Sequence, residues 1–234
     1  MKIKKLSIII PVYNEEGTIG RVIKEVKKLK LPIEKEIIVV DDGSADRSFE
    51  RIKRLKGIKI LRHEKNKGKG AAVKTALRKV TGEIVLIQDA DLELDPAYIP
   101  ALIKPILENK AQVVFGSRNA SKKGACKDRG RDPIFYLGSI LVSVLTNLLY
   151  GTKITDEYCG YKAFKTDLIK SIKINNDRFE WEAEITIKIT KKKIPIYEVP
   201  IVSKRSRTAK EGKKLKKIDG LKAIMTIVKY RFKD

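Results

Sequence analysis

The chain has 234 residues, enough for one large domain or two small ones, and its 42% hydrophobic and 35% charged residues exclude a disordered protein. Cys126 and Cys159 lie far apart in the sequence and the chain has 1 histidine, so neither a zinc site nor a disulfide framework is expected. The first residues lack the apolar stretch and cleavage site of a signal peptide, which favours a cytoplasmic location.

The formal net charge of +23 suggests an anionic partner. Nucleic acid, an anionic membrane surface and a phosphorylated substrate are the physical candidates. Residues 204–217 hold eight basic side chains against one acidic side chain, Glu211, and this clustering favours a phosphate-rich partner over a solvated basic loop. Because the basic residues are not interleaved with aromatics and match no recognised binding motif, nucleic acid is not expected as a partner.

The first half of the chain alternates short apolar runs with segments of helical spacing. Strands are predicted at residues 6–12, 36–40, 59–62, 83–88 and 112–116, and helices at 15–30, 46–56, 71–80 and 97–108. This alternation with short joins predicts a parallel sheet covered by helices. Ligands of such sheets bind at the carboxyl ends of the strands.

The second half is less regular. Residues 119–133 are polar, which predicts a mobile or functional loop. Residues 134–150 carry no charge, but 17 residues is marginal against the ~20 that a membrane span requires. On a helix, Ser139 and Ser143 would lie on a face opposite Leu141 and Leu148, so a buried or interface-lying amphipathic helix is favoured over a span. The tail, 221–233, alternates in the same way.

Two carboxylates follow the apolar run at residues 84–87. Asp89 and Asp91 are two positions apart, so on an extended chain their side chains share one side. Carboxylates that close repel one another unless a cation lies between them, and Mg²⁺ or Mn²⁺ held together with ligand phosphates meets that need. A helix cap or a solvated turn is the alternative. Residues 11–15 and 41–42 also lie at predicted strand ends, which favours a shared site.

Several motifs occur in a fixed order that resembles family 2 glycosyltransferases. They are residues 8–16 (IIIPVYNEE), 39–44 (VVDDGS), 66–70 (NKGKG) and 89–91 (DAD). Residues 116–118 (GSR), 198–200 (EVP) and 207–214 (RTAKEGKK) are similar to the dolichol-phosphate mannose synthase branch and its polyprenyl-phosphate relatives. The resemblance implies a single Rossmann-like GT-A domain of the α/β class, with a mostly parallel mixed sheet and helices on both faces.

The resemblance also implies a division of the chain. Residues 1–118 would form the nucleotide-sugar-binding half, and residues 119–202 the acceptor-binding half with the loop 119–133 and the helix 134–150. Residues 203–234 would form a basic loop and a C-terminal amphipathic helix.

The donor nucleotide sugar is assigned by the same resemblance. Its site would comprise Pro11, Val12, Tyr13, Glu15, Val40, Asp42, Lys69, Asp89, Ala90, Asp91, Arg207 and Lys213. Pro11 would set the turn after the strand, and Tyr13 offers a flat face for stacking. Glu15 and Asp42 would accept hydrogen bonds from base or ribose, or else cap the helices that follow them. Asp89, Asp91 and Glu93 would hold the metal, although many relatives carry Gln in place of Glu93.

The acceptor site is predicted around arginines. Arg118 and Arg131 look like the family's acceptor-phosphate arginines, with Arg129 as an alternative to Arg131. A phosphate monoester, with a second pKa near ~6, is already ionised at neutral pH, so it requires cations and no general base. Asp156 lies where hydroxyl-transferring relatives place their base, and here it is interpreted as a positioning residue.

The function predicted is a metal-dependent, inverting transfer of a hexose from GDP-mannose or a UDP-hexose to a polyprenyl or dolichyl phosphate. Catalysis would involve Asp91, Arg118, Arg131 and Asp156, and inversion follows because no nucleophile pair suggests a covalent sugar intermediate. The protein would sit peripherally on an anionic membrane, at its cytoplasmic face. The alternatives are transfer to a sugar or protein hydroxyl with Asp156 as base and, from another class, a basic nucleic-acid-binding protein.

Overall fold

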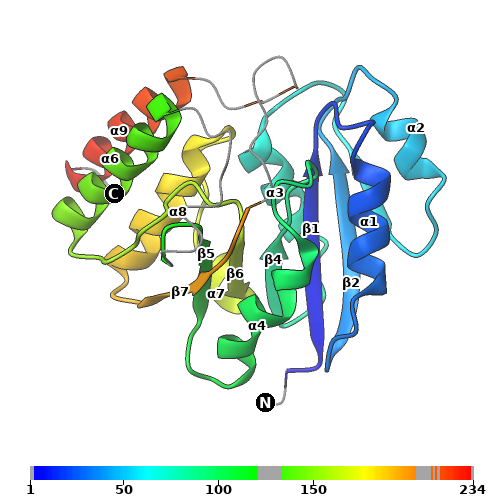
Figure 1. Cartoon of the computed structure of the whole chain (residues 1–234), viewed down its shortest axis with the longest axis horizontal. Helices are drawn as coiled ribbons and strands as arrows, with labels where there is room; N and C mark the ends of the chain where they lie inside the picture. Colours follow the sequence, from blue (N-terminus) through cyan, green and yellow to red (C-terminus); the bar gives the residue numbers. More distant parts are fainter. Residues whose placement is uncertain (1–2, 121–132, 204–211, 213, 215–216, 233–234) are drawn as a thin grey trace.

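The sheet at the centre of the molecule contains seven strands in the described part of the chain, in the order β3-β2-β1-β4-β6-β5-β7 (Figure 1). The computed structural model describes residues 3–120, 133–203, 212, 214 and 217–232. Neighbouring strands are parallel except at β6, which is antiparallel to β4 and β5. The strands are β1 Lys5–Val12, β2 Glu34–Asp41, β3 Lys59–Arg62, β4 Ile84–Ile87, β5 Val113–Ser117, β6 Lys162–Lys165 and β7 Ile196–Pro200.

Helices cover both faces of this sheet. One face is covered by α1 (Ile19–Lys28), α2 (Ser48–Lys53) and α4 (Ile99–Leu107), the other by α3 (Lys69–Leu77), α7 (Thr166–Lys170) and α8 (Glu180–Lys191). The continuous apolar runs of β1 and β4 suit this arrangement, because a strand covered on both faces contributes side chains to two cores. A mostly parallel mixed sheet with helices on both faces is therefore confirmed.

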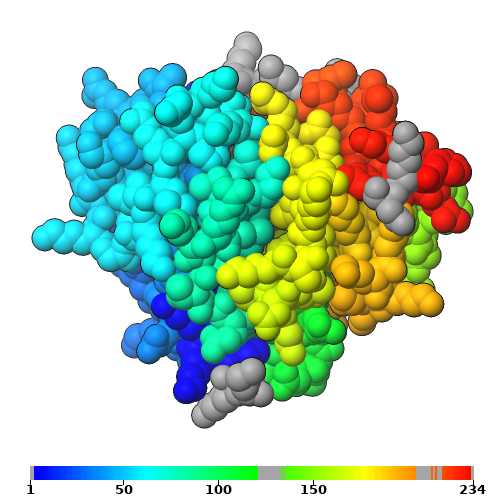
Figure 2. All heavy atoms as spheres, turned by 180° about the vertical axis from the view of Figure 1, so that it is seen from behind, coloured from blue at the N-terminus to red at the C-terminus, as the bar shows by residue number. Residues whose placement is uncertain are grey.

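Two further helices, α6 (Pro133–Tyr150) and α9 (Lys217–Phe232), lie side by side outside α8 (Figure 1). Val142, Ile187 and Ile227 belong to the small apolar cluster that joins α6, α8 and α9. Figure 2 shows the yellow and orange atoms of the α7–α8 region between the first half of the chain and the red atoms of α9. The two outer helices are thus attached to the sheet through α8.

The orientation of α6 is unusual for an amphipathic helix. Ser139, Ser143 and Thr146 are buried, whereas Leu137, Leu141, Val144 and Leu148 are 55–78% exposed. Inward hydroxyls are tolerated because each donates to a backbone carbonyl of its own helix: Ser139 to Tyr136, Ser143 to Ser139 and Thr146 to Val142. Within the described residues, no helix is long and apolar enough to cross a membrane.

Most predicted elements of the first half agree with the structure to within a few residues, but the second half contains elements that the sequence did not predict. In β6, Lys162 is fully buried because its ammonium donates to the carbonyls of Glu157 and Cys159 and pairs with Glu182 at 3.4 Å. A lysine argues against a core strand, so periodicity alone missed β6. Near the start of the predicted helix 97–108, Pro96 begins a 3₁₀ turn (Pro96–Tyr98) ahead of α4, and Pro100 lies in the first turn of α4, where its missing amide donor is tolerated.

Candidate active site

A cavity of about 830 Å³ opens across the carboxyl ends of β1, β2, β4 and β5. Because β6 alone of the described strands runs the other way, the carboxyl ends of those four strands lie at one edge of the sheet. Many predicted site residues line this cavity: Pro11, Val12, Tyr13, Glu15, Asp42, Lys69, Asp89, Ala90, Asp91, Glu93 and Arg118. Motifs separated by more than 100 residues in the sequence are thus brought together.

Other predicted residues lie elsewhere. Val40 is fully buried in the core with Ile38 and Ala72, so its side chain lies beneath the cavity rather than at its surface. Asp156 is also fully buried and lies behind Arg118. Three predicted residues, Arg131, Arg207 and Lys213, lie outside the described residues.

The wall formed by the turn after β1 is held by backbone contacts. The Glu15 amide donates to Ser48 Oγ at 2.7 Å, and the Glu15 carbonyl accepts from the amides of Thr18 and Ile19 at the start of α1. The Glu15 carboxylate accepts from the Thr18 hydroxyl at 2.9 Å. Glu15 therefore starts the helix through its backbone, and its side chain lines the cavity rather than capping α1.

Asp42 organises the loop that follows β3. Its carboxylate accepts hydrogen bonds from the Asn66 side chain and from the amides of Lys67 and Gly68 at 2.7–3.0 Å, and it contacts His63 Nδ1 at 2.6 Å. His63 Nε2 lies 2.9 Å from the Thr75 hydroxyl of α3. Asp42 therefore fixes the Gly-rich turn ahead of α3 and does not cap α2, while one edge of it still lines the cavity.

Asp89, at the end of β4, is paired with a buried lysine. Lys69 Nζ lies 2.7 Å from Asp89 Oδ1 and 2.8 Å from Glu182 Oε1. Burial lowers the pKa of Lys69, but the Asp89 and Glu182 carboxylates outweigh that effect and raise the pKa above its ordinary value. Gly160 packs against the other oxygen of Asp89, where a Cβ would overlap the carboxylate. This position therefore requires glycine as long as Asp89 keeps its place.

The candidate metal ligands lie on the short loop after β4. Asp91 Oδ1 accepts the Glu93 amide at 3.0 Å, and Leu92 between them has a φ of 65°. In the described part of the chain, no three acidic, histidine or cysteine side chains are grouped closely enough to form a metal site by themselves. The carboxylate oxygens of Asp89, Asp91 and Glu93 still suit Mg²⁺ or Mn²⁺, which take one or two carboxylates together with substrate phosphates.

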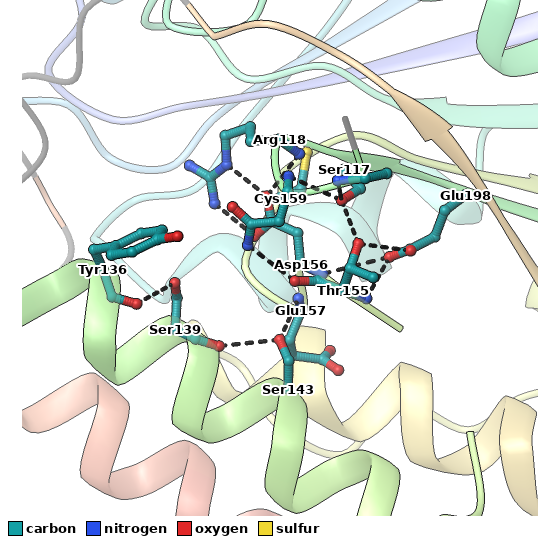
Figure 3. Close-up of polar contacts among 12 residues, drawn as sticks. Ser117, Arg118, Tyr136, Ser139, Ser143, Thr155, Asp156, Glu157, Cys159 and Glu198 are labelled. Carbon is teal, nitrogen blue, oxygen red and sulfur yellow. Dashed lines mark hydrogen bonds and ion pairs between the residues drawn. The ribbon is translucent and has the colours of Figure 1, made fainter. Parts of the chain in front are cut away.

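Arg118, just beyond β5, is held by Asp156 (Figure 3). Its backbone amide, Nε and Nη2 donate to the Asp156 carboxylate at 2.7–3.0 Å. Asp156 follows Thr155, whose amide and hydroxyl donate to the Glu198 carboxylate at 2.8 and 2.7 Å. The pair therefore places a guanidinium at the cavity wall in a defined orientation.

Glu157 adds a buried carboxyl beside this pair. Burial raises the pKa of Glu157 to about 7, although the nearby Lys162 ammonium and the Thr186 hydroxyl act in the opposite direction. The Thr186 hydroxyl donates to Oε1 at 2.6 Å, and within the described residues Oε2 has no hydrogen-bond partner.

Two residues that line the cavity were not among the predicted site residues. Lys214 donates to the Asn14 carbonyl at 3.0 Å and lies 5.9 Å from the centre of the Tyr13 ring, so the basic tail reaches the cavity wall after β1 through Lys214. The resemblance indicated Lys213, and the basic cluster was the available signal. Glu182 pairs with Lys69 inside the cavity. Residues 179–182 resemble a family segment beside the acceptor, but the same four residues also suit the start of a helix.

The far side of the cavity is formed by α6 and α9. Leu141 of α6 and Ile218 and Leu221 of α9 line it. The same three side chains are 50–56% exposed, so the cavity continues into an apolar outer surface. We call this surface the α6–α9 face; it comprises Leu137, Leu141, Val144, Leu148, Ile218, Leu221, Met225, Val228 and Phe232.

The Rossmann-like sheet, the acidic loop after β4 and the cavity across the carboxyl ends agree with the GT-A glycosyltransferase fold that the resemblance implies. Residues 7–173 match the family described as glycosyl transferase family 2. The chain belongs to that family and is a glycosyltransferase.

Curated relatives and solved structures extend this assignment. The chain is 31% identical to the UDP-N-acetylglucosamine–dolichyl-phosphate N-acetylglucosaminyltransferase of Methanococcus voltae, over 85% of each protein. It is 29% identical to the dolichol-phosphate mannosyltransferase of Pyrococcus furiosus, over 79% of this chain and 53% of the relative. A Mycobacterium tuberculosis glucosyl-3-phosphoglycerate synthase, crystallised with Mn²⁺, UDP and phosphoglyceric acid, has a TM-score of 0.74 at 24% identity, over 98% of this chain and 79% of that one. This last likeness establishes the fold.

Proposed function

We propose that the protein transfers a hexose from a nucleotide sugar to a polyprenyl or dolichyl phosphate, with Mg²⁺ or Mn²⁺ bound. The observation that carries the proposal is the continuity of the cavity, which joins Asp89 and Asp91, Arg118 and the exposed α6–α9 face. Along this cavity, the acidic residues would hold the metal ion of the activated sugar, Arg118 would bind the acceptor phosphate, and the α6–α9 face would contact the lipid chain. The names of the M. voltae and P. furiosus relatives support the same substrate class.

The donor would lie against the β1 and β2 ends. Tyr13 offers a stacking face, Glu15 and Asp42 line the base end, and Lys214 approaches from the tail. Asp91, with Asp89 and Glu93, would hold the divalent ion, which neutralises the charge of the departing nucleoside diphosphate. Lys69 and the tail residues Arg207 and Lys213 would add positive charge to the same phosphates.

The acceptor phosphate would meet Arg118, with Arg131 as a second contact. A phosphate oxygen attacks the sugar C1 as the bond from C1 to the diphosphate oxygen breaks, which inverts the configuration in one displacement. The attacking oxygen is already ionised near neutral pH, so no general base is needed. Asp156 supports this reading, because its carboxylate is fully buried and accepts from Arg118. If Asp156 were the base in a transfer to a hydroxyl, its carboxylate would have to give up its hydrogen bonds with Arg118.

The α6–α9 face would rest on an anionic membrane at its cytoplasmic side. Its apolar side chains suit the acyl boundary, and the exposed Lys229 and Arg231 of α9 suit anionic headgroups. The acceptor's hydrocarbon chain could then stay in the membrane while its phosphate enters the cavity beside Leu141.

Radiolabelled-sugar transfer tests the proposal. A thermal-shift screen of GDP- and UDP-sugars with Mn²⁺ first identifies the donor, because selective binding stabilises the fold. The labelled donor is then incubated with a polyprenyl phosphate, the matching unphosphorylated polyprenol and a sugar acceptor. Label in the polyprenyl phosphate product alone is expected. Transfer to the sugar acceptor but not to the lipid phosphate would refute the proposal.

A further inference from the structure

The segment Ile154 to Glu157, which carries Asp156, is held by α6. Asn147 of α6 bonds Ile154 twice: its Nδ2 donates to the Ile154 carbonyl at 2.8 Å and its Oδ1 accepts the Ile154 amide at 3.0 Å. One turn earlier in α6, the Ser143 hydroxyl accepts the Glu157 amide at 3.1 Å (Figure 3). The partners of the two α6 side chains, Ile154 and Glu157, therefore lie on either side of Asp156 in the sequence.

The opposite side of the same segment is attached to the sheet. Glu198 of β7 accepts from the amide and hydroxyl of Thr155, and the Thr155 hydroxyl lies 2.5 Å from Ser117 Oγ at the end of β5 (Figure 3). The segment is thus held between the sheet edge and α6, and at Glu157 it is also bonded to Thr186 of α8 and Lys162 of β6. A shift of α6 relative to the sheet would be transmitted to Asp156 and from there to Arg118.

The other face of α6 is exposed and apolar. Leu137, Leu141, Val144 and Leu148 are exposed, and Leu141 also lines the cavity, while Ser143 and Asn147 hold the segment on the inner side. Because α6 carries both faces, a contact on its outer apolar face can affect the residues that are hydrogen-bonded to its inner face. Packing alone does not explain Ser143 and Asn147, because apolar side chains of similar size would fill the same space and would need no hydrogen-bond partners.

We propose that Asn147 and Ser143 are positioning residues through which membrane contact at α6 sets the orientation of Arg118 for the acceptor phosphate. This inference rests on the proposed membrane docking and on Arg118 as the acceptor arginine. It makes the membrane an activator of the enzyme as well as the location of the acceptor. Transfer to an acceptor that is itself dissolved in water therefore increases when the enzyme is bound to a membrane.

The test uses a five-carbon prenyl phosphate, which stays in solution, with and without vesicles of phosphatidylcholine and phosphatidylglycerol. For the wild-type enzyme, vesicles are expected to lower the acceptor KM at least fivefold and to leave the donor Kd unchanged. In Asn147→Leu, vesicle binding and donor Kd should be retained and the change in acceptor KM lost. Any concentration of acceptor on the vesicles would affect both proteins equally.

Thr146→Val is the matched control. Thr146 is buried on the same inner side of α6, but its hydroxyl bonds the Val142 carbonyl of its own helix at 2.9 Å. This variant should keep the full vesicle effect. Ser143→Ala, which removes the partner of the Glu157 amide, should show a partial loss and serves if Asn147→Leu does not fold.

The outcomes separate the two proposals. A wild-type enzyme that binds vesicles without any change in acceptor KM overturns the inference while the proposed function stands. Retention of the vesicle effect in both Asn147→Leu and Ser143→Ala also overturns it. Failure of the wild-type enzyme to bind vesicles refutes the proposed docking itself, and the inference falls with it.

Discussion

The donor side and the acceptor side of the cavity are built in different ways. On the proposed donor side, Tyr13, Asp42 and Asp89 follow three neighbouring parallel strands, so the strand before each residue sets its backbone position. On the acceptor side, Arg118 depends on Asp156, which in turn depends on β7 and α6. A strand end is positioned by local backbone geometry, whereas a suspended segment is positioned by contacts distant in sequence. Substitutions on the two sides should therefore fail differently.

The largest effect is expected for Asp91→Ala on the donor side. Loss of this carboxylate should reduce transfer by about 10³-fold, because the charge of the departing diphosphate is no longer neutralised in the transition state. Calorimetry should show that Mn²⁺ no longer strengthens donor binding. Full turnover in this variant would exclude Asp91 from the metal site.

Arg118→Ala should reduce transfer by about 10²-fold while donor affinity stays near that of the wild type. The guanidinium would contact the acceptor phosphate and leave the nucleotide untouched. Arg118→Lys is expected to recover only part of the activity, since an ammonium cannot form the paired bonds to Asp156. A defect confined to donor affinity would place Arg118 in the donor site, and the proposed difference between the two sides of the cavity would then be wrong.

Leu148→Glu should weaken vesicle binding by about tenfold, because Leu148 is 78% exposed on the α6–α9 face and its burial in a bilayer would be lost. Transfer to a water-soluble acceptor without vesicles should be unchanged. Co-sedimentation with anionic vesicles measures the effect, and exposed Glu50→Lys on α2 is a control that should not reduce it. Equal binding by Leu148→Glu would mean that another surface docks.

The prediction for Glu157→Gln concerns the pH dependence of stability rather than transfer or vesicle binding. Burial raises the pKa of Glu157 from 4.5 to about 7, so its contribution to stability is fully present below about pH 4.5 and is lost as the pH rises through 7. Between pH 5 and pH 8.5, the free energy of unfolding of the wild type should therefore fall by ~2 kcal/mol more than that of the variant. Urea unfolding at the two pH values measures this change in the free energy of unfolding. The control variant at an exposed position, Glu108→Gln, should show the same pH dependence as the wild type. Parallel pH profiles for wild type and Glu157→Gln would contradict the shift.

Sequence periodicity was enough to predict the strands that carry the proposed donor site. Apolar runs such as 6–12 and 84–87 form strands that are covered on both faces. The residues that directly follow these strands lie at the cavity because the strands end there. Val40, which the resemblance placed in the donor site, has its side chain in the core, because strand residues alternate between the two faces of the sheet.

What the chain by itself determined is an alternating α/β sheet with acidic strand ends, together with the two-sided pattern of residues 134–150. Only the tertiary structure decided that the hydroxyl side of that helix turns inward, that Lys162 occupies a core strand, and that Lys69 and Glu182 meet at Asp89. The physical reason is that a buried polar group depends on partners far away in sequence. Periodicity records which side chains share a face, and the partners that make burial tolerable appear only after folding.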